Sequence, residues 1–145
     1  MRQIAKFLRL SSAERKLFIR AMLFLWAVRC GLWILPYERL YRFLFRKRHA
    51  TENLRIDHAR VALIVRSVKS TSRYVPSATC LTQALVALRL LDEAGQMARL
   101  RIGVARSDRG KLEAHAWVEC QGHVIIGGNH AELSRYTVLQ AIEGT

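Results

Sequence analysis

The chain has 145 residues, a length that one folded domain normally covers. Hydrophobic residues make up 51% of it, with eight glycines and two prolines, which excludes a disordered or collagen-like chain. The net charge is +13, and the whole excess lies in residues 1–75, which hold 17 of the 24 basic and four of the 11 acidic residues. We therefore expect a basic region over 1–75 and a neutral region over 76–145.

The first predicted element is a helix from Ser11 to about Leu35. Ser11 followed three residues later by Glu14 is a capping-box pattern, which marks a helix start. No apolar segment with a small-residue cleavage site precedes it, so we expect no secretory signal and a cytoplasmic protein.

Two arginines and two tryptophans decide how this helix is interpreted. Arg20 and Arg29 fall on opposite faces, and each charge inside a spanning helix costs roughly 2.5–3.5 kcal/mol. We therefore expect a buried helix surrounded by others and no membrane contact. Trp26, Arg29 and Trp33 share one stripe, and aromatic residues at this spacing predict core packing rather than a ligand site.

Two further helices are predicted in the basic region. Pro36 ends the first helix, and 37–47 forms the second, with Leu40, Phe43 and Leu44 inward. The third covers about 56–72 and places Val61, Ile64, Val65 and Val68 on one face.

The neutral region changes from a helical period to a period of two. Thr79-Cys80-Leu81 opens an apolar helix that ends at Gly95. Strands are predicted at 98–105, 112–119 and 123–126, whereas 131–142 fits neither a helix nor a strand clearly.

The residues suited to covalent chemistry are Cys80 and His115. Cys80 lies at a predicted helix start, where free backbone amides and the helix dipole favour the thiolate. His115 lies within a strand between two alanines, and needs hydrogen-bond partners if it is buried. A small buried cysteine and a satisfied core histidine are the alternatives.

The other cysteines give no sign of a disulfide framework or a zinc site, because Cys30, Cys80 and Cys120 are widely spaced without a CxxC pair. Cys120 and His123 flank a turn but lack a third ligand, so we interpret them as structural. We expect no metal and no cofactor.

Three segments of the neutral region carry a recognisable pattern. They are Pro76-Ser77-Ala78-Thr79-Cys80-Leu81-Thr82-Gln83-Ala84-Leu85, Ala98-Arg99-Leu100-Arg101-Ile102-Gly103-Val104 and Ala114-His115-Ala116-Trp117-Val118-Glu119. Together they resemble the transglutaminase-like leader peptidases of lasso-peptide biosynthesis. The order and spacing agree, and the N-terminal helices are similar as well.

The resemblance implies an α+β fold, with N-terminal helices followed by a papain-like helix and an antiparallel sheet. It also implies a cysteine peptidase that removes the leader from a ribosomally made precursor peptide before a macrolactam is formed. Cys80 would be the nucleophile and His115 the base. The implied partners are the precursor, a separate winged-helix leader-recognition protein and an asparagine-synthetase-like cyclase.

The third catalytic residue departs from the family pattern. Family members often carry an Asp about a dozen positions after the His, but no Asp follows His115, and Gly127-Gly128 occupies that stretch. A two-residue turn at 121–122 would place His115 opposite Gly128, whereas a three-residue loop or a bulge would place it opposite Asn129. We select Asn129 as the orienting residue, with a solvent-exposed loop Asn as the alternative.

Two other functions compete with the peptidase. The missing Asp favours an inactive peptide-binding or partner-binding module. The basic region would also suit a nucleic acid or an anionic membrane surface, but no nucleic-acid motif accompanies the charge, and we expect no nucleic-acid partner. We interpret this region as a docking surface for an acidic leader or its carrier, with Arg42, Arg46 and Arg48 in contact.

Overall fold

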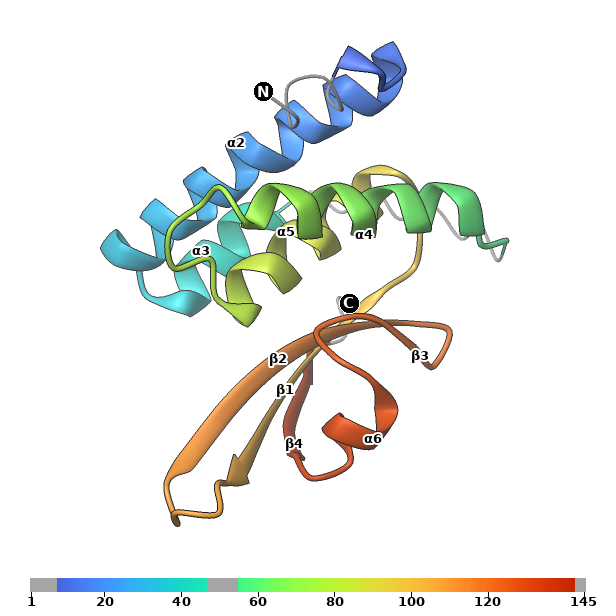
Figure 1. The fold of residues 1–145 in the computed structure, drawn as a ribbon. Coiled ribbons are helices and arrows are strands. Elements are labelled where there is room, and N and C mark those ends of the chain that lie inside the picture. The colour runs from blue at the N-terminus through green and yellow to red at the C-terminus, as the bar shows by residue number, and fades with distance from the viewer. Residues whose placement is uncertain (1–7, 47–54, 143–145) are drawn as a thin grey trace.

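The structure is a computed structural model, and it describes residues 8–46 and 55–142. In this part of the chain, helices lie over one face of an antiparallel sheet of four strands in the order β3-β2-β1-β4 (Figure 1). The predicted α+β class is confirmed. The elements are α2 (Ser12–Ile34), α3 (Tyr37–Leu44), α4 (His58–Ser72), α5 (Cys80–Glu93), β1 (Arg99–Arg106), β2 (Leu112–Cys120), β3 (His123–Ile126), α6 (His130–Leu133) and β4 (Thr137–Ile142).

The helix starts agree with the capping residues in the sequence. Ser11 N donates to Glu14 Oε2 at 2.8 Å, and Glu14 N donates to Ser11 Oγ at 3.2 Å, so the predicted capping box begins α2. Thr79 caps α5, since its Oγ1 accepts from Thr82 N at 3.3 Å. Gly95 follows the end of α5 with φ +70°, as the predicted helix stop requires.

The hydrophobic core centres on α5. Its buried side chains, such as Leu85 and Leu91, belong to one cluster with Leu25 of α2, Ile64 of α4 and Val118 of β2. This cluster contains residues from both sides of position 75. The basic helices and the sheet therefore share one core.

The outer face of α2 contradicts the expectation of a helix surrounded by others. Only Ala21, Leu25 and Val28 are buried, whereas Trp26 is 45% and Trp33 82% exposed. The prediction of core packing for these tryptophans is wrong. The reason is that α4 and α5 pack against one side of α2 only, and in the described ranges the other side faces solvent (Figure 1).

The structure corrects one other expectation and assigns one segment that the sequence left open. Phe43 of α3 is 73% exposed instead of inward, and Phe45 just beyond the helix is buried in its place. The segment 131–142, which fits neither a helix nor a strand in sequence, holds the last three residues of the four-residue helix α6 and then β4, which forms an edge of the sheet beside β1. A helix this short cannot show a 3.6-residue period.

We predict opposite effects for two leucines of α2. Leu25→Ala should lower the free energy of unfolding by about 2–5 kcal/mol, because it leaves a cavity between the helices. Leu23→Ala should change it by no more than about 0.5 kcal/mol, because Leu23 is 64% exposed. Urea unfolding of the two variants measures both values, and a large loss for Leu23→Ala would show that this face is covered.

Candidate active site

Cys80 is the first residue of α5, at the end of the helix that meets the solvent. Its side chain is half-buried, and among the described residues no group accepts a hydrogen bond from the backbone amides of Cys80 and Leu81. Ser77, in the turn before the helix, has φ +57°, an uncommon value for a residue with a side chain. Free amides and the positive end of the helix dipole stabilise a thiolate and an oxyanion.

The other two cysteines are placed differently. Cys30 is exposed on α2. Cys120 is buried, its thiol donates to the carbonyl of Met97 at 3.1 Å, and burial raises its pKa. Within residues 8–46 and 55–142, no three His, Cys, Asp or Glu side chains gather as a metal site would require.

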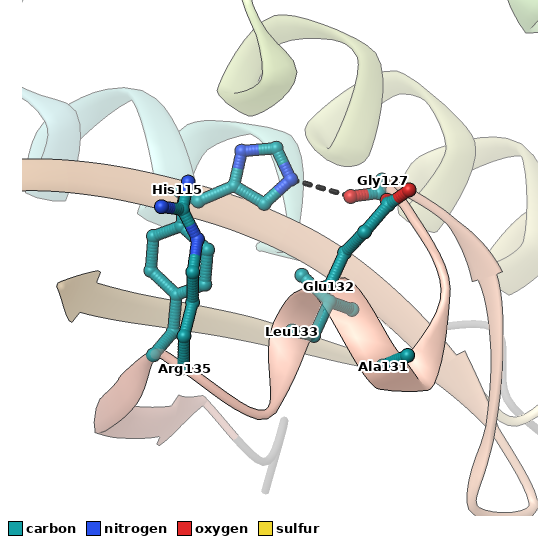
Figure 2. Close-up of a pocket in the computed structure, with 7 residues that line it drawn as sticks. His115, Gly127, Ala131, Glu132, Leu133 and Arg135 are labelled. Carbon is teal, nitrogen blue, oxygen red and sulfur yellow. Dashed lines mark hydrogen bonds between the residues drawn. The ribbon is translucent and has the colours of Figure 1, made fainter. Parts of the chain in front are cut away.

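The imidazole of His115 has a defined tautomer. His115 pairs with Gly103 across the ladder between β2 and β1, and its Nε2 forms a hydrogen bond with the carbonyl oxygen of Gly127 (Figure 2). Because a carbonyl can only accept, Nε2 carries the proton in this contact. The lone pair of the neutral ring is therefore on Nδ1, which is the atom available to act as a base.

His115 shares its face of the sheet with two aromatic rings. Its centroid is 6.4 Å from the ring of Trp117 and 5.4 Å from that of Tyr136. Ala116 and Val118, which alternate with these residues along β2, belong to the core under α5. His115 thus points to the face opposite α5, and in the described residues no hydrogen bond joins it to Cys80.

Gly127 reaches its position because it has no side chain. A Cβ at this residue would lie 2.6 Å from Trp117 Cβ and 2.8 Å from the carbonyl oxygen of Ala116, and its φ is +106°. The chain can therefore pass directly against β2 and present its carbonyl to His115. The predicted two-residue turn, which pairs Cys120 with His123, is present; Ile125 is the extra residue of a bulge before Ile126 pairs with Val118.

Asn129 does not orient His115 in this structure. Its Oδ1 accepts from Glu132 N at 2.9 Å, and Glu132 Oε2 accepts from Asn129 N at 3.4 Å, so the two residues form the capping box of α6. The physical reason is that Gly127 and Gly128, with φ +106° and +131°, turn the chain away from β2 before Asn129 is reached. The Gly127 carbonyl makes the contact that was predicted for the Asn129 side chain.

A pocket of about 430 Å³ opens beside His115. Figure 2 shows its walls, which come from β2, the loop after β3, and α6 with the residues that follow it. Arg135 Nη2 donates to the Tyr136 hydroxyl at 3.0 Å and lies 3.2 Å from Glu113 Oε2, and the contact with Tyr136 is the main cause of a raised Arg135 pKa. The lining residues are His115, Gly127, Ala131, Glu132, Leu133, Arg135 and Tyr136.

Sequence reasoning missed most of this pocket. The contacts of Tyr136, Glu132 and Arg135 with the site depend on the turn made by α6, which leaves no periodic signal. The glycine pair 127–128 was the one visible sign, since adjacent glycines indicate unusual backbone angles or a close approach.

The comparison with known families identifies the class of protein. The family described as the transglutaminase-like superfamily matches residues 22–141, and the chain belongs to this superfamily. The match contains both Cys80 and His115, and members typically have cysteine peptidase or transferase activity. No curated protein and no solved structure gives a match to the chain.

We predict that Gly127→Ala destabilises the protein more than Gly122→Ala. Both glycines have positive φ, which costs about 1–2 kcal/mol for alanine in the left-handed region. Only at Gly127 would the new Cβ also clash with β2, and overpacking adds at least about 1 kcal/mol. Urea unfolding compares the variants; equal losses would contradict the close packing of Gly127 on β2.

Proposed function

We propose that this protein is a cysteine peptidase that removes the leader from a ribosomally made lasso-peptide precursor. The observation that carries the proposal is Cys80 at the start of α5, half-buried, beside two backbone amides that have no acceptor in the described residues. Membership of the transglutaminase-like superfamily supports the cysteine chemistry. The resemblance of the segments around Cys80 and His115 to leader peptidases supports the substrate.

The reaction follows from the groups at the two positions. The Cys80 thiolate adds to the carbonyl of the bond after the leader, and the amides of Cys80 and Leu81 stabilise the oxyanion. His115 Nδ1 accepts the thiol proton and gives it to the leaving amine, which frees the core peptide. Water then hydrolyses the thioester and releases the leader acid.

This mechanism requires Nδ1 of His115 to meet Cys80 at the free edge of β2. Strand β1 pairs with β2 at His115 on one side, but β3 pairs only with residues 118–120, so on its other side β2 has no strand partner beside His115 in the described chain. An extended peptide can add to such an edge through main-chain hydrogen bonds. We propose that the precursor binds along this edge. The His115 side chain then rotates around the edge of β2, which brings its Nδ1 to Cys80.

The proposed partners are the proteins that a leader peptidase of this kind would need. A separate winged-helix protein presents the leader, and an asparagine-synthetase-like enzyme closes the macrolactam, all in the cytoplasm. Arg42 and Arg46, exposed on and after α3, would contact the acidic leader or its carrier. Arg48, the third predicted contact, lies outside the described residues.

A second function is favoured by one observation. Since no hydrogen bond joins Cys80 to His115 in the described residues, the chain also fits an inactive transglutaminase-like module that only binds a peptide or a partner. The reactivity of Cys80 separates the two functions.

We predict that Cys80→Ala and His115→Ala each abolish leader removal. The first variant lacks the nucleophile and the second the base, and because both side chains are only partly buried we expect both variants to fold. Mass spectrometry of the precursor, incubated with the enzyme and its recognition partner, measures the cleavage. Undiminished cleavage by either variant would refute the peptidase function.

We predict that Cys80 is alkylated well below pH 8.5 and that His115→Ala removes this reactivity. A thiol without activation titrates near ~8.5, whereas a thiol that shares its proton with an imidazole reacts at lower pH. The experiment uses a Cys30→Ser background, because Cys30 is exposed, and buried Cys120 has a raised pKa. A profile that is the same with and without His115 would favour the binding module.

We predict that Asn129→Ser keeps the rate of leader removal within about threefold of the parent, because Ser caps a helix about as well as Asn. Serine at this position would retain the cap of α6 but is too short to replace an amide that orients His115. A loss of about a hundredfold or more would show that the Asn129 amide, and not the Gly127 carbonyl, orients the catalytic imidazole.

A further inference from the structure

Large apolar side chains follow one another along the solvent face of α2. They recur at helical spacing from Ile19 to Ile34, and the 15 steps of 1.5 Å between these two residues span about 22 Å. Leu23 is 64%, Trp33 82% and Ile34 80% exposed. We call this surface the outer stripe; its members are Ile19, Leu23, Trp26, Cys30, Trp33 and Ile34.

The outer stripe has basic borders and no acidic residue. At 100° per residue, Arg20 lies along one border and Arg15 and Arg29 along the other. The guanidinium of Arg29 is 5.6 Å from the ring centroid of Trp33. The one acidic residue of α2, Glu14, is used in the capping box. Tryptophan with flanking arginine is typical of helices that lie at the surface of an anionic bilayer.

Helix α2 is also tied to the rest of the fold. By length and composition alone it would suffice to cross a membrane. However, its inner face packs in the core with Leu25 buried, and Arg20 forms an ion pair with Glu93 of α5. A helix held in this way can lie in the plane of a membrane surface but cannot span it without unpacking the domain.

Charge distinguishes between two candidate occupants of the outer stripe, a second copy of the chain and an anionic lipid surface. A second copy of the chain would bring another +13 charge and a second set of arginine borders against the first. An anionic lipid surface instead pairs with Arg15 and Arg29, while its acyl region accepts the apolar side chains. Charge complementarity therefore favours lipid over a second copy.

We propose that the outer stripe of α2 binds the surface of a membrane that contains anionic phospholipids, with the helix parallel to the bilayer plane. This reverses the sequence-based expectation of no membrane contact. That expectation assumed that other helices cover α2, and the structure leaves Trp26 and Trp33 in solvent. The proposal is independent of the peptidase function.

The test is binding of the full chain to vesicles of phosphatidylglycerol and phosphatidylcholine, followed by flotation and tryptophan emission. Of the three tryptophans, Trp26 and Trp33 lie in the stripe and Trp117 is only 3% exposed, so a blue shift on binding reports the stripe. We expect weaker binding to phosphatidylcholine alone and weaker binding at high salt.

Matched double variants decide whether the stripe makes the contact. Leu23→Ser with Ile34→Ser should lower the vesicle partition coefficient by about tenfold or more, since each removes a buried apolar group from the bound state. Leu112→Ser with Leu139→Ser removes two leucines that are 71% and 63% exposed on β2 and β4, and should bind as the parent does.

Three results would overturn the proposal. They are the absence of binding to the anionic vesicles, equal binding by both double variants, and a concentration-dependent dimer that the stripe variant abolishes without any vesicle binding. The last result would assign the stripe to a second copy. Circular dichroism of each variant confirms that the fold is retained.

Discussion

The structure depends on the burial of α5. This helix packs against α2 and α4 on one side and against β2 on the other, and most of its side chains are inaccessible to solvent. Apolar burial of this extent is the main favourable contribution to folding. Because Cys80 is the first residue of α5, the same packing that stabilises the domain also fixes the position of the Cys80 sulfur.

A polar junction holds the basic helices onto α5. Arg89 of α5 donates to the carbonyl oxygen of Leu44 at 2.5 Å and to Glu93 Oε1 at 2.9 Å, and Glu93 also pairs with Arg20 of α2. These charges are partly screened from water, so their mutual contacts satisfy groups that burial would otherwise penalise. The contacts of Arg89 with Leu44 and of Arg20 with Glu93 therefore connect the basic helices directly to the neutral half of the chain.

Much of the fold was predictable because local chemistry determines it. Ser11 and Thr79 satisfy free amides at helix starts, and alternation along β2 places Val118 in the core and Trp117 on the other face. The exposure of Trp33 was not predictable, because the pattern of apolar residues within one helix does not show how many other helices or strands will pack against it. Phe43 was predicted inward for the same reason, since exposure in α3 depends on a neighbouring element.

The candidate site was predictable in part. Cys80 and His115 belong to motifs with recognisable neighbours. The hydrogen-bond partner of His115, however, is a backbone carbonyl, and because every residue has one, residue type gives no sign of which carbonyl will lie there. A bulge was one of the two ways in which Asn129 could come to lie opposite His115, and the bulge at Ile125 is present, but the two glycines turn the chain away from β2 before Asn129 is reached. Tertiary geometry, and not side-chain chemistry, determined which group contacts the imidazole.

The order of the layers has a consequence for how substrates reach the protein. Helix α2 is at one side of the molecule, α5 lies between, and the sheet with α6 forms the other side (Figure 1). A molecule resting on lipid through α2 would present the pocket beside His115 to the aqueous phase. Peptides would then enter and leave through water, while partners bound to the same bilayer would be found by a search in two dimensions instead of three.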